Sequence, residues 1–268
     1  MKKNTIFMCL SLGLAGLLSS CSSFDNPYEP KEVASEKGLL TLNLASGVEF
    51  NVATRAADET LWRDKNNYDI TITKIGGTPQ TKKYSEWNFP MSIDPGDYQV
   101  SASYGEEKDA SHDTFLSTGT SETFSITAGQ PSNADIECTP TAGKIIVEFA
   151  SDMDTYCSDY SVDFTGTTAL GSKKVTSSKT DNSPWYLAIK EGGETINYTI
   201  NVTTKTDYAE KEGSATGNFP IERNHTKKLT IKANHTPNTE GGISITITID
   251  KGTEERPEDI EIPVTWDN

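Results

Sequence analysis

Side chains that carry most enzyme chemistry are scarce in this sequence. It has three histidines in 268 residues, and none of them stands at a spacing typical of a zinc site. The four cysteines form no C-x-x-C pair, and no G-x-S-x-G, P-loop or glycine-rich dinucleotide turn is present. Carboxylates are abundant, yet nothing selects two of them as a poised acid and base. We therefore expect a protein that is not an enzyme and that holds no cofactor and no metal ion.

Positive charge is also in short supply. Lysine and arginine together number 24, against 39 aspartates and glutamates, which gives a formal net charge of −15. A surface of this sign repels phosphate backbones, so nucleic acid is not an expected partner.

A long apolar run is missing as well, because the run at the N-terminus covers only residues 6–18. A membrane-spanning helix needs about 20 apolar residues, so a shorter run behind two lysines is typical of a signal peptide. The run ends at Leu18-Ser-Ser-Cys21, which makes residues 1–20 a lipoprotein signal and Cys21 the acylated residue. Two or more acyl chains hold a protein stably on a membrane. We therefore predict an outer-membrane protein, anchored through lipid on Cys21 and exposed at the cell surface. The alternative is an ordinary secretory signal with a chance cysteine.

Only two cysteines are left for the folded part of the chain. Cys9 leaves with the signal peptide and Cys21 carries lipid, so Cys138 and Cys157 remain. An exported compartment permits a disulfide between them, but the sequence does not give their separation. A Cys138–Cys157 disulfide and two buried free thiols both stay open.

The folded part alternates apolar and polar residues, with β-branched and aromatic residues prominent, and no long window has a helical period. This pattern predicts an all-β protein of two tandem immunoglobulin-like or transthyretin-like β-sandwich domains. The predicted strands are residues 40–44, 48–52, 68–72, 98–102, 124–126, 134–138, 144–149, 160–164, 185–189, 196–202, 219–221, 229–231, 243–249 and 260–266. The predicted parts are a signal peptide (1–20), a flexible tether (21–37), domain one (38–139), domain two (140–250) and an extended C-terminal tail (251–268).

Two halves of the chain echo each other. Residues 124–126 precede residues 134–136, and residues 219–221 precede residues 229–231 at the same separation, each time as Phe-x-Ile before an apolar-x-Ile. Two similar domains are the economical interpretation, and one larger sandwich is the alternative.

Two features leave a binding role open. Trp62 and Trp266 lie in polar company, so either could stack on sugar rings at the surface, which would make the chain a carbohydrate-binding lipoprotein of a glycan-uptake system. Trp87 and Trp185 stand beside apolar residues and are expected in the core. The carboxylates Asp152, Asp154 and Asp159 are interpreted as a solvated acidic turn rather than a calcium loop, because no glycine-driven turn accompanies them.

One junction resembles a known family. Thr54-Arg55-Ala56 closes the first predicted pair of strands, and residues 93–100 read Ile-Asp-Pro-Gly-Asp-Tyr-Gln-Val. Together with the lipobox, they are similar to the motifs of the fimbrillin-like lipoproteins of Bacteroidetes, which form or accompany type V pili. A related family of uncharacterised lipoproteins with two β-sandwich domains shares the Pro-Gly turn.

The resemblance implies a structural or adhesive subunit, or an accessory protein, of a fimbrium. In that family an arginine-specific protease cuts at the junction, which here would be the Arg55–Ala56 bond. The first strand, residues 39–52, would then leave together with the lipid. An extended segment of the next subunit would take its place by strand addition, with residues 243–249 or 260–266 as the donor. The alternative is that Arg55 lies on an ordinary hairpin loop and residues 243–249 are the last strand of domain two.

Overall fold

The computed structural model describes residues 37–47, 50, 58–208, 210–235, 243–250, 258–262 and 265–266. The predicted lipidation site Cys21 and the predicted junction residues Arg55 and Ala56 lie outside these ranges. By its contacts the chain divides into Met1–Ala34 and Ser35–Asn268, and the second unit holds every described residue. None of the described helices is long and apolar enough to cross a membrane.

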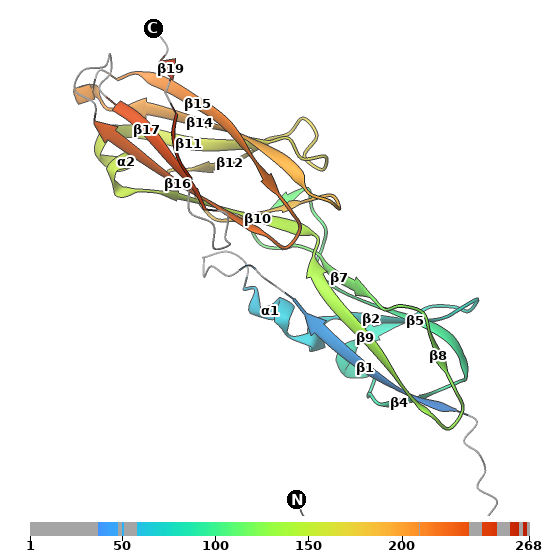
Figure 1. The fold of residues 1–268 in the computed structure, drawn as a ribbon. Helices are drawn as coiled ribbons and strands as arrows, with labels where there is room; N and C mark the ends of the chain where they lie inside the picture. The colour runs from blue at the N-terminus through green and yellow to red at the C-terminus, as the bar shows by residue number, and fades with distance from the viewer. Residues whose placement is uncertain are drawn as a thin grey trace, which may run out of the picture. The chain divides into compact units, whose positions relative to one another are not determined.

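The described chain is built almost entirely of strands (Figure 1). The elements of the first half, residues 37–140, are β1 (Gly38–Ser46), α1 (Thr60–Arg63), η1 (Lys65–Asn67), β2 (Asp69–Lys74), β3 (Gln80–Lys83), η2 (Tyr84–Glu86), β4 (Met91–Ile93), β5 (Gly96–Tyr104), β6 (Ala110–Ser111), β7 (Ser117–Thr120), β8 (Phe124–Ile126) and β9 (Pro131–Pro140). Those of the second half, residues 141–266, are β10 (Ala142–Phe149), α2 (Ser151–Tyr156), β11 (Cys157–Thr165), β12 (Val175–Ser178), β13 (Trp185–Ala188), β14 (Glu194–Thr204), η3 (Thr206–Tyr208), β15 (Glu212–Ile221), β16 (Thr226–His235), β17 (Ile243–Asp250), β18 (Glu258–Ile262) and β19 (Thr265–Trp266). The predicted all-β class is confirmed.

The first half folds around one apolar cluster. One layer has the order β4-β1-β9, the other has the order β3-β2-β5-β7, and β8 pairs with β5. β9 belongs to both layers, because its first residues pair with β1 while Thr139 and Pro140 pair with β7. Alternation along the strands turns every second side chain inward. The fully buried members of the cluster include Leu40, Tyr68, Ile70, Val100 and Cys138.

The second half is a sandwich of two sheets. A six-stranded sheet has the order β18-β17-β16-β10-β13-β6, and a five-stranded sheet has the order β12-β11-β14-β15-β19. Both sheets contribute to a single buried cluster, which contains Ile145, Leu187, Leu229, Ile231 and Ile247 from the first sheet and Val162, Phe164, Ile196 and Ile200 from the second. The predicted C-terminal tail contains β18 and β19, and each of them stands at the edge of a sheet.

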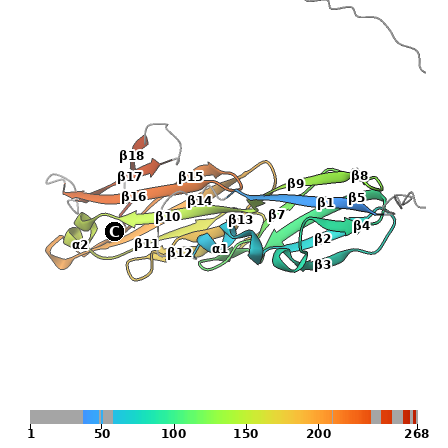
Figure 2. The same ribbon diagram turned by 90° about the horizontal axis from the view of Figure 1, so that it is seen from below.

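The two halves repeat one pattern of strand pairing. In each half the first strand pairs in parallel with a strand much later in the chain, β1 with β9 and β10 with β16, and Figure 2 shows the two members of each pair side by side. The second strand pairs with the third and with the long fifth strand, β2 with β3 and β5, and β11 with β12 and β14. An aromatic pair recurs as well: ring centroids are 6.5 Å apart for Tyr98 and Phe124, and 6.0 Å apart for Tyr198 and Phe219. The echo in the sequence is therefore a structural repeat, while the domain boundaries around residue 140 stay a prediction.

The halves are closely joined. Thr141 alone separates β9 from β10, so the predicted break at this point is a single residue. β6 of the first half pairs with β13 of the second, which extends the six-stranded sheet with residues from the other half. A third buried cluster contains Phe50, Trp62 and Phe115 from the first half and Ala142 and Tyr186 from the second.

Candidate functional site: the first strand and its anchor cluster

β1 lies between two strands along part of its length. Residues Gly38, Leu39 and Leu40 pair antiparallel with β4, and eight residues from Leu39 to Ser46 pair parallel with β9. A side chain at position 38 would be blocked, since a Cβ atom there would lie 2.5 Å from Cγ2 of Ile126 and 2.7 Å from the carbonyl oxygen of Thr127. The strand is therefore held chiefly by main-chain hydrogen bonds to β9, with close packing where it begins.

The inward face of β1 completes the core of the first half. Leu40 and Leu42 are buried, whereas Leu39 points outward and is 39% exposed. Burial of a leucine side chain contributes about 1.5–3 kcal/mol, so these two residues anchor the strand. On the outer face Asn43 donates a hydrogen bond from Nδ2 to Oδ1 of Asp135 on β9, at 2.8 Å. Removal of β1 would open a groove beside β9 with an apolar floor.

After β1, the aromatic side chain of Phe50 packs into the protein interior. Phe50 is only 2% exposed and packs in the third cluster. Its ring lies edge-on to Phe115, with centroids 5.2 Å apart, and tilted against Tyr186 at 5.5 Å. The Nζ atom of Lys144 is 5.7 Å from the centroid of the same ring, within the range of a cation–π contact.

A buried ion pair stands in the same cluster. Lys144 of β10 has a side chain only 1% exposed, and its Nζ atom lies 2.5 Å from Oε1 of Glu59, whose side chain is 14% exposed. The hydroxyl of Tyr186 donates to the same oxygen at 2.6 Å. Burial, reinforced by this bond to Glu59, raises the pKa of Tyr186, which keeps the phenol protonated as the donor. Glu59 therefore links the first half to two strands of the second.

The cluster holds both sides of the predicted junction. Phe50 precedes Arg55 in the chain, and Glu59 and Trp62 follow it. The Phe50 ring lies against Phe115, Tyr186 and Lys144. Of these three, Glu59 binds Lys144 and Tyr186, and Trp62 stacks on Phe115. The predicted scissile bond, Arg55–Ala56, is thus flanked by two anchors in one buried cluster.

Trp62 is not a surface residue, and its predicted role in stacking on sugars is wrong. It is 4% exposed, its ring stacks on Phe115 at 4.3 Å, and its Nε1–H donates to the carbonyl oxygen of Phe115 at 3.1 Å. Polar neighbours in sequence misled the prediction, because α1 turns this one side chain inward. The backbone of Trp266 lies in β19, and its side chain is outside the described residues.

Of the two alternatives for Cys138 and Cys157, the structure contains the free thiols and not the disulfide. Cys138 and Cys157 are free and fully buried, and they belong to the cores of different halves. Burial raises the pKa of the Cys138 thiol to about 12 and that of the Cys157 thiol to about 11. Both thiols pack as small apolar side chains.

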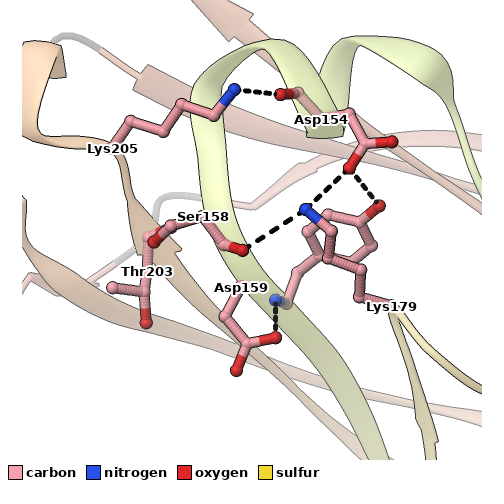
Figure 3. A network of polar contacts seen from close by, with 7 residues as sticks. Asp154, Ser158, Asp159, Lys179, Thr203 and Lys205 are labelled. Carbon is pink, nitrogen blue, oxygen red and sulfur yellow. Dashed lines mark hydrogen bonds and ion pairs between the residues drawn. The ribbon is translucent and has the colours of Figure 1, made fainter.

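The acidic stretch near the start of the second half forms structural contacts (Figure 3). Asp154 pairs with Lys179 at 2.9 Å and accepts a hydrogen bond from the Tyr160 hydroxyl at 3.0 Å. Asp159 accepts from the backbone N–H of Tyr160, and Asp152 accepts from that of Ala233. The three carboxylates thus face different partners, and the part of the chain that is described contains no group of three or more ligating side chains that could hold a metal ion.

Sequence reasoning missed Glu59, Lys144 and Tyr186. The one available signal was a lysine inside the apolar strand of residues 144–149, where a charge needs a buried partner. Its partner lies 85 residues earlier, which no local pattern indicates.

Comparison with solved structures finds chains that are similar to this one at low identity. A fimbrial assembly protein from Parabacteroides distasonis is similar over 86% of this chain and 99% of its own, at 9% identity and a TM-score of 0.46. The fimbrial anchor protein Mfa2 from Porphyromonas gingivalis is similar over 84% of this chain and 99% of its own, at 12% identity and a TM-score of 0.38.

The family of the chain is shown by its sequence. No curated protein matches the chain. A family model does match it, over residues 36–264. The chain belongs to that family, which is described as a domain of unknown function, DUF4493.

Proposed function

We propose that this chain is a non-enzymatic, lipid-anchored protein of the cell surface that serves as a structural or adhesive component of a fimbrium. The observation that carries the proposal is the placement of β1. This strand fills a groove beside β9 and is followed by the Thr54-Arg55-Ala56 junction. A cut at Arg55–Ala56 would separate the strand and the lipid on Cys21 from the rest of the chain.

The groove suits exchange of one strand for another. Most of the hydrogen bonds that hold β1 join main-chain groups, which any extended segment can supply. Specificity would come from the side chains that replace Leu40 and Leu42 in the core of the first half. An incoming strand of a neighbouring subunit with apolar residues at alternate positions meets both requirements.

Of the two donor candidates in the sequence, the structure favours residues 260–266. Ile243, Ile245, Ile247 and Ile249 of β17 are all buried in the core of the second half, so withdrawal of β17 would open that core. β18 and β19 are edge strands, and β19 pairs through only Gly213 and Ser214. Release of β18 or β19 breaks the pairing with one neighbouring strand, whereas release of β17 breaks the pairing with both β16 and β18.

The test uses the mature protein and an arginine-specific protease. We expect a cut after Arg55, followed by growth of oligomers visible by size-exclusion chromatography and electron microscopy. The matched control is Arg55→Lys, which keeps the charge and removes the cleavage site, and it should stay monomeric. Resistance of the native protein at Arg55, or a cut protein that remains monomeric, would overturn the role as an assembling subunit.

A further inference from the structure

The outer face of the five-stranded sheet in the second half has a polar hollow that the proposed function leaves unused. We propose that this hollow binds a neutral saccharide and supplies the ligand contact of an adhesive protein. The inference deepens the adhesive role and rests on it. It requires neither cleavage at Arg55 nor release of β1, so it can be tested on the intact chain.

The hollow spans three neighbouring strands, β11, β14 and β15, and has a volume of about 320 Å³. Sites for small molecules begin at about 300 Å³, so a mono- or disaccharide unit is the size of ligand that suits it. The strand register arranges its outward side chains in two rows across the sheet. One row is Ser161, Asn201 and Ser214, and the next is Asp159, Thr203 and Glu212.

A β-bulge aims one of the two carboxylates into the hollow. The register of β11 against β14 shifts between Cys157 and Asp159, and Ser158 and Asp159 are exposed in succession. Without the shift, Asp159 would share the inward face of Cys157, because alternate residues of a strand face the same side. The Ser158 hydroxyl donates to the carbonyl oxygen of Thr203 at 3.2 Å, and Figure 3 shows Asp159 and Thr203 on their neighbouring strands. Bulges commonly re-aim a side chain at a functional site.

The side chains of the hollow are available to a ligand. Four of them form no hydrogen bond or ion pair within the part of the chain that the structure describes: Ser161, Thr203, Glu212 and Ser214. Asp159 accepts from the backbone N–H of Tyr160 at 2.9 Å through one of its two oxygens. Asn201 donates to Asp163 at 3.4 Å through its nitrogen and not its oxygen. A ligand can therefore bind these groups without breaking contacts of the fold.

Most side chains of the hollow are also short. Among the described residues, no lysine or arginine lines it, and Tyr160, Val202 and Gly213, which complete the lining, are buried. The outer face of the six-stranded sheet differs, because it carries long charged side chains such as those of Lys228 and Glu148, which pair at 2.5 Å. Long side chains lose more rotamer freedom when a ligand immobilises them, so binding at the hollow costs less entropy.

The chemistry of the lining indicates a sugar. Carboxylates accept hydrogen bonds, whereas hydroxyls and the Asn201 amide both donate and accept. Neighbouring hydroxyl groups of a sugar ring match this mixture, since each of them can also donate and accept. The charges of Asp159 and Glu212 repel phosphate, sulfate and uronic acids, which makes a neutral saccharide the fitting class.

A divalent cation fits the hollow less well. Asp159 and Glu212 stand on β11 and β15, with β14 between them, and neighbouring strands lie about 4.8 Å apart. Calcium needs six or more oxygen ligands around one point. Two carboxylates separated in this way are better placed to accept hydrogen bonds from hydroxyl groups at two ends of a saccharide.

The first measurement tests the class of ligand on the full-length mature chain without protease treatment. NMR titrations use lactose, maltose, cellobiose and mannobiose as neutral probes, a heparin disaccharide as the acidic probe and a chitosan disaccharide as the cationic probe. We expect at least one neutral disaccharide to bind, with chemical-shift changes confined to the backbone amides around the hollow. The heparin disaccharide should not bind, because the carboxylates repel it.

Variants of the lining locate the site. Asn201→Ala and Ser214→Ala each remove one hydrogen-bonding group from an outward, partly exposed position, so the fold should be kept. Each variant should bind the neutral probe about 3- to 10-fold more weakly, the loss expected for one hydrogen bond. Ser244→Ala is the matched control, because Ser244 is a partly exposed serine of β17 on the other sheet, and it should bind like the native chain.

A filling variant supplies a further test. Thr203→Lys places a long cation between Asp159 and Glu212, so it should occupy the hollow, keep the fold and abolish binding. The inference is wrong if none of the four neutral disaccharides binds, if only a charged probe binds, or if the lining variants bind as tightly as Ser244→Ala. The structural role stands in each of these cases, because it is measured separately by the growth of oligomers after cleavage. A cleaved protein that stays monomeric and still binds the neutral probe would instead remove the structural role and leave the saccharide site.

Discussion

Lys144 is a charged side chain inside a strand that otherwise builds a core. Withdrawal of an ammonium group from water is costly, and Glu59 offsets this cost at 2.5 Å. A pair of this kind adds little net stability compared with two apolar residues, but it penalises any arrangement in which one partner is alone. Its role here is to specify where the segment that follows the junction docks on the second half.

Removal of one partner should therefore be far more damaging than removal of a surface pair. We expect Glu59→Gln to lower the free energy of unfolding by about 3–5 kcal/mol, because it leaves the Lys144 charge buried without its carboxylate. The control is Lys173→Ala, which removes an exposed pair with Asp109 and should cost at most about 1 kcal/mol. Urea unfolding measures the free energy of unfolding of both variants. Equal losses would show that the buried pair contributes no more to stability than the exposed pair.

The buried thiols predict how stability changes with pH. The pKa values of Cys138 and Cys157 rise from 9.0 to about 12 and about 11 in the folded protein. Above pH 9 the unfolded thiols ionise while the folded ones stay protonated, so the free energy of unfolding should fall as the pH rises. Each group contributes at most about 1.4 kcal/mol per pH unit in this range.

Urea unfolding at pH 8, 9.5 and 10.5 measures this slope. Cys138→Ala should flatten it, since the variant has one ionisable thiol fewer, and an unchanged slope would contradict the assignment. Mass spectrometry provides an independent check: peptides that contain Cys138 and Cys157 should be modified by a thiol reagent only after the protein has been unfolded.

At the scale of elements, the strands were predictable wherever one face of a sheet is buried. β5, β9, β14 and β17 each alternate apolar and polar residues over most of their length, and this pattern reports burial directly. β7 and β12, with the sequences STGT and VTSS, were missed because their side chains are small and polar. The pairing of the strands could not be predicted from the sequence, since register depends on contacts between residues far apart in the chain.

β17 provides a test of which C-terminal strand belongs to the folded monomer. Ile247 is fully buried in the core of the second half. Ile247→Ala should lower the free energy of unfolding of the monomer by about 2–5 kcal/mol, through lost burial and the cavity that remains. Ile75→Ala is the matched control, because that isoleucine is 55% exposed and should cost little. If the two variants unfold alike, β17 does not form part of the monomer core and becomes the better donor.

At the scale of the whole molecule, the repeated halves are joined by more than a linker. β6 extends the sheet of the other half, and the third cluster mixes side chains from both. The sequence predicted the repeat from its echo, yet it gave no sign of this junction. Phe50, Phe115 and Tyr186 are spread over more than 130 residues, and only the fold brings them together.

This junction should make the two halves unfold as one unit. We expect a single calorimetric transition for the native protein, because separation of the halves would expose the third cluster. Phe115→Ala removes the ring that contacts Phe50, Trp62 and Tyr186, at a cost of about 3–5 kcal/mol. The variant should show two transitions, and a single sharp transition at lower temperature would instead mean that the halves remain coupled through the strands alone.

The parallel pairing of β1 with β9 has a mechanical consequence. Tension between the proposed lipid anchor before Gly38 and a load beyond Pro140 would pull the start of β1 and the end of β9 in opposite directions. Parallel strands pulled in this way slide along each other, so the hydrogen bonds over eight paired residues are loaded together rather than broken one by one. β10 and β16 repeat the arrangement over six paired residues. In single-molecule stretching from these points, the first half should resist as a stiff unit and yield in one step, whereas an attachment that peels β1 from its C-terminal end should open it gradually at lower force.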